Sequence, residues 1–127
     1  MNDNDKAPIG SLAWTDLTVP NAEDVQEFYS SVVGWGSAPV EMGEYNDFNM
    51  TLPGSGEATA GICHARGENA NLPAQWLIYI TVEDVDASAK RCAELGGRVL
   101  DGPRAMGAYR LCVIEDPAGA VAALIAQ

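Results

Sequence analysis

The sequence predicts an α+β protein built from two tandem βαβββ modules, and three observations support this fold class. Residues 75–100 read as a strand, a capped helix, a glycine stop and a new strand. Shifted back by 63 positions, the same pattern falls on residues 14–35, with Thr81 on Thr18. Each predicted helix is followed by three short strand-like segments. At 127 residues, the chain is long enough for one domain with a sizeable core.

The first module opens with a strand at Leu12 to Val19 that ends at a proline. Asn21 is a suitable N-cap residue for the helix that follows, because its side chain can accept a hydrogen bond from a first-turn amide. Gly34 is predicted to end that helix, since glycine readily adopts the left-handed conformation found after helices. The apolar stripe that repeats at helical spacing consists of Val25, Phe28, Tyr29 and Val32.

Three short strands are predicted to complete the first module, at residues 37–42, 45–52 and 57–64. Turn residues separate them, and a segment rich in structure breakers follows. We therefore predict a first module at about 9–64 and a linker at 65–74.

The second module, predicted at about 75–126, starts with a strand at 76–82. Asp84 is expected to cap its helix, and Gly96 with Gly97 to end it. The predicted buried stripe of the helix is Val85, Ala89, Cys92 and Leu95. The predicted strands are 98–100, 109–114 and 120–125, the last two joined by a type I turn at 116–119. The whole chain, 1–127, is predicted to be a single domain.

Composition limits the partners and the location that we expect. The formal net charge of −11 argues against nucleic acid or an anionic membrane as a partner, because both require clustered basic residues. No apolar run is long enough to span a bilayer. The first residues lack the basic start and apolar run of a signal peptide, so we expect a cytoplasmic protein. Residues 1–8 are predicted to be a polar tail, and the three cysteines to be reduced core residues.

Alternation along the first strand of each module separates two faces. One face is aliphatic and suited to pack on the helices; it includes Ala13, Leu17, Val19, Ile78, Ile80 and Val82. The other face mixes aromatic, acidic and hydroxyl groups, as small-molecule pockets often do; it carries Trp14, Asp16, Thr18, Leu77, Tyr79 and Thr81. A half-exposed sheet would show the same alternation.

Segments in both halves of the chain resemble the vicinal-oxygen-chelate superfamily, which includes glyoxalase I, bleomycin-resistance proteins and extradiol dioxygenases. They are the strand-to-helix segment at residues 19–29 with Gly34-Trp35, and the segments 82–87, 94–99 and 116–120 of the second half. The resemblance extends from Ile9 nearly to the end of the chain. It implies a curled mixed sheet that forms a cup, with the helices outside and a small-molecule ligand inside. It also implies a homodimer.

Metal-dependent members of this superfamily carry His, Gln or Glu at four positions on these strands. By this resemblance, three positions match Trp14, Leu77 and Ala123, and the fourth falls near Gly61. None of these side chains offers a ligand suited to a divalent cation. We therefore expect no metal site and no cofactor.

Other residues offer limited chemistry. His64, the only histidine, is a candidate for a pocket role or a surface role, and its neighbour Cys63 points to the opposite side of a strand, so the two form no nucleophile–base pair. Asp16 is a candidate general base or a contact for a cationic or hydroxylated ligand. Arg110 either closes the mouth of the pocket or forms a surface salt bridge.

Three functions fit these observations. The chain is interpreted first as a metal-free binder of a small aromatic or cationic molecule. The alternative is an enzyme of the glyoxalase or dioxygenase kind (lyase, isomerase or oxygenase) with a displaced metal or an acid–base mechanism. A third is an interaction module with a vestigial pocket. The predicted ligand-binding residues are Trp14, Asp16, His64, Leu77, Tyr79 and Arg110; the catalytic residues are unknown.

Overall fold

The computed structural model describes residues 7–127, so most of the predicted polar tail lies outside the described part. The chain forms two compact units. We call residues 15–76 the first module, and residues 77–127 together with 7–14 the second module. The division falls inside two strands, β1 (Leu12–Val19) and β5 (Trp76–Thr81).

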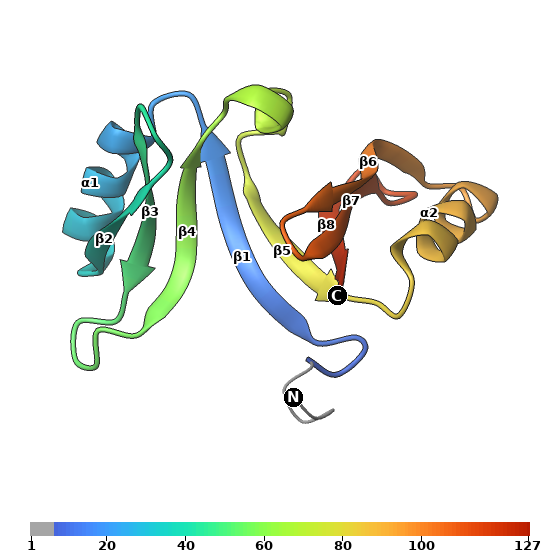
Figure 1. Ribbon diagram of the computed structural model, residues 1–127, viewed down its shortest axis with the longest axis horizontal. Coiled ribbons are helices and arrows are strands. Elements are labelled where there is room, and N and C mark those ends of the chain that lie inside the picture. The colour runs from blue at the N-terminus through green and yellow to red at the C-terminus, as the bar shows by residue number, and fades with distance from the viewer. Residues whose placement is uncertain (1–6) are drawn as a thin grey trace. The chain divides into compact units, whose positions relative to one another are not determined.

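The first module has a mixed sheet and one helix, as predicted (Figure 1). Its strands lie in the order β2-β3-β4-β1. Strand β4 is parallel to β1 and antiparallel to β3, which in turn is antiparallel to β2. Besides β1, the elements are α1 (Ala22–Val33), β2 (Gly36–Glu41), β3 (Asn46–Thr51) and β4 (Ala58–His64).

Helix α1 packs on the face of the sheet that the alternation in β1 predicted. Leu17 and Val19 are buried in one cluster with Ala22 of the helix. The helix ends at Gly34, whose φ of 89° lies in the left-handed region that glycine adopts without strain. Asn21 occupies the N-cap position, but its side chain makes no capping hydrogen bond. The start of this helix therefore depends on packing more than on a cap.

A group of aromatic rings extends this core. The ring of Tyr29 lies against the rings of Trp35 and Trp76, with centroid separations of 6.0 and 5.3 Å. All three side chains pack against the buried cluster of the first module. The predicted linker at 65–74 contains a single 3-10 turn, Gly67–Asn69.

The second module repeats the arrangement, with strand order β5-β8-β7-β6 and β5 parallel to β8. Its helix begins as predicted, because the Asp84 side chain accepts a hydrogen bond of 3.1 Å from the Ala87 amide. Val85 and Ala89 of the helix are buried with Cys112, while Ile80 and Val82 pack against this cluster. The elements are α2 (Val85–Glu94), β6 (Arg98–Met106), β7 (Tyr109–Glu115) and β8 (Val121–Ala126). The predicted α+β class with two βαβββ modules is confirmed.

Strand β6 is longer than predicted. The sequence predicted a strand ending at 100, but the strand continues to Met106. Register shifts on either side of Asp101 interrupt the ladder, and Gly102 adopts a φ of 85°. Irregularities of this kind admit glycine and proline without ending the strand, which is why the composition suggested a loop.

A turn and a pair of hydrogen bonds from the N-terminal residues hold the strands of the second module in place. The predicted turn forms at 116–119, where the Gly119 amide donates to the carbonyl of Asp116 at 3.0 Å. At the other end of the chain, Gly10 donates to the carbonyl of Thr81 at 2.7 Å, and the Thr81 amide donates to Ser11 at 2.9 Å. These bonds join the described N-terminal residues to the second module.

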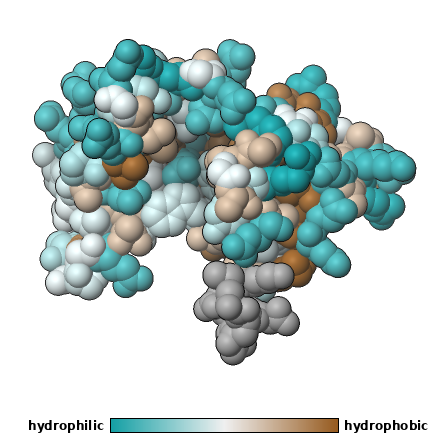
Figure 2. All heavy atoms as spheres, in the orientation of Figure 1, coloured by the Kyte–Doolittle hydropathy of each residue, from teal (hydrophilic) through white to brown (hydrophobic). Residues whose placement is uncertain are grey.

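The surface agrees with the acidic composition. Hydrophilic side chains cover much of the visible surface of each module, and hydrophobic ones appear in small patches (Figure 2). Among residues 7–127, no helix is long and apolar enough to cross a membrane.

Candidate functional site

The face of the first module opposite α1 is polar. Met50 and Ile62 belong to the helix-side core, so their neighbours along each strand point the other way. Register then places these neighbours together: Asp16 lies beside Gly61, and Asn49 lies opposite Gly61. We call this surface the polar face. It consists of Asp16, Thr18, Asp47, Asn49, Thr51 and Cys63.

Two carboxylates of the polar face affect the pKa of the Cys63 thiol. Burial, followed by the negative charges of Asp16 and Asp47, raises the pKa of Cys63 above its ordinary value. The thiol also donates a hydrogen bond to Asp47, which stabilises its protonated form. Cys63 is therefore a poor nucleophile, because the thiolate is the reactive species. The same two charges favour a cation in place of an anion at this position.

Asp47 also binds His64. One carboxylate oxygen, Oδ1, accepts a hydrogen bond of 2.9 Å from the His64 backbone amide. The same oxygen lies 3.3 Å from Nδ1 of the imidazole. The two side chains are only 13% and 14% exposed, so the carboxylate holds the ring in a partly dehydrated setting. This pair was not predicted from the sequence.

The imidazole ring also contacts Tyr45, whose ring centroid lies 5.1 Å away in an edge-to-face arrangement. The guanidinium of Arg66 stacks over the Tyr45 ring, with its central carbon 4.0 Å from the ring centroid. Glu44 pairs loosely with Arg66 at 3.9 Å. The orientation of His64 is thus restricted by a carboxylate and by an aromatic ring.

The other predicted ligand-binding residues on β1 and β5 are Trp14, Leu77 and Tyr79. Trp14 is half-buried, whereas Leu77 and Tyr79 are 1% and 5% exposed. Leu77 and Tyr79 lie on the face of β5 away from the α2 cluster, since Ile80 packs toward that cluster. Tyr79 is in register with Ala123 of β8. These placements agree with the predicted faces, and their role in binding stays a prediction.

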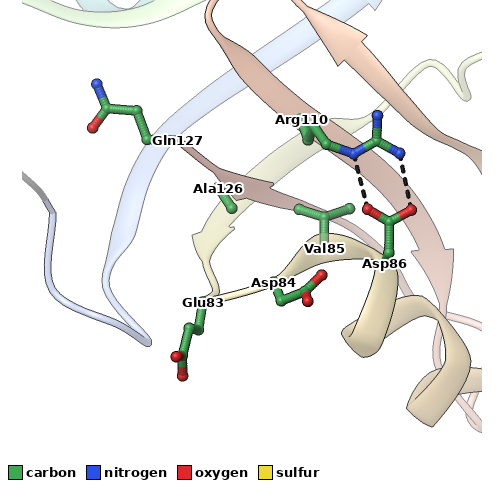
Figure 3. Close-up of a pocket in the computed structure, with 7 residues that line it drawn as sticks. All are labelled: Glu83, Asp84, Val85, Asp86, Arg110, Ala126 and Gln127. Carbon is green, nitrogen blue, oxygen red and sulfur yellow. Dashed lines mark hydrogen bonds and ion pairs between the residues drawn. The ribbon is translucent and has the colours of Figure 1, made fainter.

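Arg110 lies on β7 and pairs with Asp86 at the start of α2. Its guanidinium makes two hydrogen bonds of 2.9 Å to the carboxylate of Asp86. The pair lines an open pocket of about 320 Å³ in the second module, together with Glu83, Asp84, Val85, Ala126 and Gln127 (Figure 3). Of the two interpretations of Arg110 from the sequence, the salt bridge is the one that the geometry displays. Because the guanidinium is paired, this pocket is predominantly acidic.

The residues at the positions expected to hold a metal do not suit a divalent cation. Leu77 and Ala123 are buried apolar side chains, Gly61 has none, and the indole of Trp14 can only donate. Side chains with oxygen atoms that are in register with these positions are Asp16 and Asn49 beside Gly61, and Tyr79 beside Ala123. In the described range 7–127, no three His, Cys, Asp or Glu side chains are grouped as metal ligands.

Sequence reasoning missed Asp47 and Asn49. Residues 47–51 alternate between polar side chains and the apolar Phe48 and Met50, which is a period-two signal for two faces. That signal was available, but the partner strands of β3 had to be known before Asp47 could be placed beside Cys63 and His64.

Comparisons with known proteins agree with this architecture. A family profile described as "Glyoxalase/Bleomycin resistance protein/Dioxygenase superfamily" matches residues 11–124. The anthracycline biosynthesis protein DnrV of Streptomyces peucetius is 29% identical over 131 residues, which cover 91% of this chain. The chain spans between 42% and 46% of the length of the curated relatives that it matches.

Solved structures share the fold at low identity. A Streptomyces coelicolor methylmalonyl-CoA epimerase variant bound to 2-nitronate-propionyl-CoA has a TM-score of 0.58 and 20% identity, covering 94% of this chain and 99% of the epimerase. A glyoxalase/bleomycin resistance protein/dioxygenase superfamily member from Vibrio splendidus also has a TM-score of 0.58, with 13% identity and coverages of 90% and 97%. At these identities the likeness concerns the fold alone.

Proposed function

The chain belongs to the glyoxalase/bleomycin resistance protein/dioxygenase superfamily, and from this premise we propose that it binds a small aromatic or cationic organic molecule without a metal ion. The observation that carries the proposal is that Asp16 and Asp47 lie on the same face as Cys63, where their negative charges raise the pKa of its thiol. Two carboxylates on a partly buried sheet face attract a cation and repel an anion.

Polar groups on the same face supply directional contacts. Thr18 and Asn49 flank the carboxylates, and an amide or hydroxyl there can donate to or accept from a ligand hydroxyl. We include His64 in this site because it shares Asp47 with the polar face. Trp14, Leu77, Tyr79 and Arg110 are proposed as further ligand contacts on the strength of the sequence pattern.

The proposal predicts selectivity by charge. Tyramine combines an aromatic ring with an ammonium group, and phenyltrimethylammonium is an aromatic cation without N–H or O–H donors. Benzoate is an aromatic anion. In a thermal-shift assay, both cations are expected to raise the unfolding temperature and benzoate to leave it unchanged, because a ligand that binds the folded state stabilises it. Stabilisation by benzoate alone, or by none of the three, would contradict the proposal.

Asp16 provides the matched variant. Asp16→Asn keeps the shape of the side chain and removes its charge, so the shift produced by tyramine, measured against the unliganded variant, is expected to fall. Asp24→Asn, on an exposed part of the first turn of α1, removes the same charge away from the site and serves as the control. Equal losses in both variants would indicate that only the overall charge matters.

A second candidate function is acid–base catalysis of the lyase, isomerase or oxygenase type. The Asp47–His64 pair favours it, since an imidazole oriented by a carboxylate is a common arrangement for proton transfer.

Metal analysis of the purified protein separates both candidate functions from that of a metal-dependent enzyme. Protein purified without chelators is expected to hold no stoichiometric divalent ion, and one tightly held ion per chain would overturn the metal-free proposal.

We also propose that the protein is cytoplasmic and forms a homodimer. Strands β2 and β6 end the strand orders of the two modules, and free strand edges favour pairing with another chain. Size-exclusion chromatography with light scattering measures the mass directly, and a monomer at micromolar concentration would contradict the homodimer.

A further inference from the structure

His64 is held in a way that determines which ring nitrogen carries a proton. A carboxylate oxygen can only accept hydrogen bonds, so Nδ1 must carry the proton when it faces Oδ1 of Asp47 at 3.3 Å. In a neutral imidazole the lone pair is then on Nε2. The same Oδ1 accepts the backbone amide of His64 at 2.9 Å, which fixes the carboxylate relative to the ring.

The lone pair on Nε2 is accessible. No hydrogen bond joins Nε2 to another residue in the part of the chain that the structure describes. Every fully buried side-chain nitrogen or oxygen among those residues has a partner, so Nε2 must be in contact with solvent. With 13% of the side chain exposed, the ring is shielded apart from this small area. A shielded acceptor with an open lone pair is well suited to bind a donor group.

We propose that Asp47 and His64 form a proton-accepting dyad, in which Asp47 holds the Nδ1–H tautomer and Nε2 accepts a hydrogen bond from the ammonium or hydroxyl group of a small organic ligand. Asp47 is a positioning residue, because it acts through the imidazole. The assignment rests on the proposed function, and it requires an N–H or O–H donor in any ligand that contacts Nε2. Tyr45 supports the dyad by limiting rotation of the ring.

The tautomer is directly measurable because the chain has one histidine. Labelling histidine with nitrogen-15 and recording long-range proton–nitrogen spectra at mildly alkaline pH, where an ordinary imidazole is neutral, reports on His64 alone. The wild-type protein is expected to show a protonated Nδ1 and an unprotonated Nε2. The opposite tautomer, or protons on both nitrogens, overturns the dyad. This measurement needs no variant.

Variants test the role of Asp47. Asp47→Ala removes the acceptor, so the preference for the Nδ1–H tautomer is expected to be lost. Glu44→Gln removes a nearby carboxylate whose side chain is 91% exposed, and the ring spectrum is expected to remain as in the wild type. An unchanged tautomer in folded Asp47→Ala shows that the carboxylate does not orient the ring and overturns the inference.

Ligand contact is tested by adding the two cations to the labelled wild-type protein. Tyramine, which carries N–H and O–H donors, is expected to shift the Nε2 resonance, whereas phenyltrimethylammonium is expected to leave it in place. The absence of an Nε2 response to tyramine, with or without thermal stabilisation, overturns the ligand assignment. The thermal shift is measured separately. Stabilisation by tyramine without an Nε2 response refutes only the contact between ligand and Nε2, whereas no stabilisation by either cation refutes the proposed function.

Discussion

The indole Nε1–H of Trp76 donates a hydrogen bond of 3.1 Å to the hydroxyl of Tyr29, and the two rings meet edge to face at 79°. Tyr29 lies on α1, while Trp76 comes 47 positions later, after the 3-10 turn. This contact therefore joins the end of the first module to its helix. It satisfies the one polar group of each aromatic side chain in a partly buried cluster.

Removing the hydroxyl of Tyr29 is expected to destabilise the protein. Tyr29→Phe leaves the Trp76 N–H without its acceptor, and we expect a loss of about 1 kcal/mol in the free energy of unfolding. Tyr45→Phe is the matched control, because the Tyr45 hydroxyl bonds to no described residue, and its effect is expected to stay within about 0.5 kcal/mol. Urea denaturation measures both. Equal losses would show that the hydrogen bond contributes nothing specific.

The two helix starts give a second prediction. Asp84 caps α2 through its side chain, whereas Asn21 makes no such bond at α1. Asp84→Ala is expected to reduce the free energy of unfolding by about 1 kcal/mol, and Asn21→Ala by only a few tenths. The comparison uses chemical denaturation of both variants under the same conditions. A larger loss for Asn21→Ala would refute this account of the caps.

Gly97 is expected to tolerate no side chain. A Cβ at this position would lie 2.6 Å from the sulfur of Cys92 and 2.8 Å from the carbonyl oxygen of Glu115. Gly97→Ala is therefore expected to destabilise the second module by about 1–3 kcal/mol. The control is Gly54→Ala, since an added Cβ there meets no atom within 4 Å. Similar midpoints for the two variants in a thermal melt would contradict the close approach at Gly97.

Stability is expected to fall in alkaline solution because of Cys112. Burial, aided by the charges of Cys92, Asp101 and Asp86, raises the pKa of this thiol from 9.0 to about 11. Below pH 9, the folded and unfolded chains both keep the proton, and the contribution to stability is complete. As the pH rises toward 11, the unfolded chain ionises first, so stability is lost.

Cys112→Ala should reduce this loss between pH 9 and about 11, measured as the urea midpoint in reducing buffer. Val113→Ala removes buried volume beside Cys112 without removing a titratable group, so it should lower the midpoint at every pH and keep the slope of the wild type. If the urea midpoint of Cys112→Ala fell with pH as steeply as that of the wild type, groups other than Cys112 would cause the loss of stability in alkaline solution.

The sequence was sufficient for the class of fold because several local signals agreed. Alternation in β1 correctly placed Leu17 and Val19 against the helix, and Gly34 ended α1 where expected. The extent of β6 could not be predicted, since Gly102 and Pro103 usually end strands, and only the pairing with β7 shows that this one continues.

Prediction of the site was limited by long-range pairing. Asp16 and His64 were candidates from the sequence, but Asp47 became recognisable only when register placed β3 beside β4. Arg110 was ambiguous because Leu111, Cys112 and Val113 are all buried, so the alternation that would indicate its side is hidden. A strand that is buried on both faces shows no alternation, so its sequence does not indicate which side chains face the helix.

The bonds from Gly10 and Ser11 to Thr81 have a consequence for the order of assembly. The second module is discontinuous in sequence, so Gly10 and Ser11 leave the ribosome well before their partner Thr81. Residues 15–76 can form their contacts with one another before that, whereas the second module must wait until a loop of that length closes. A fragment that starts at residue 77 would lack Gly10 and Ser11, the two residues to which the backbone of Thr81 is hydrogen-bonded.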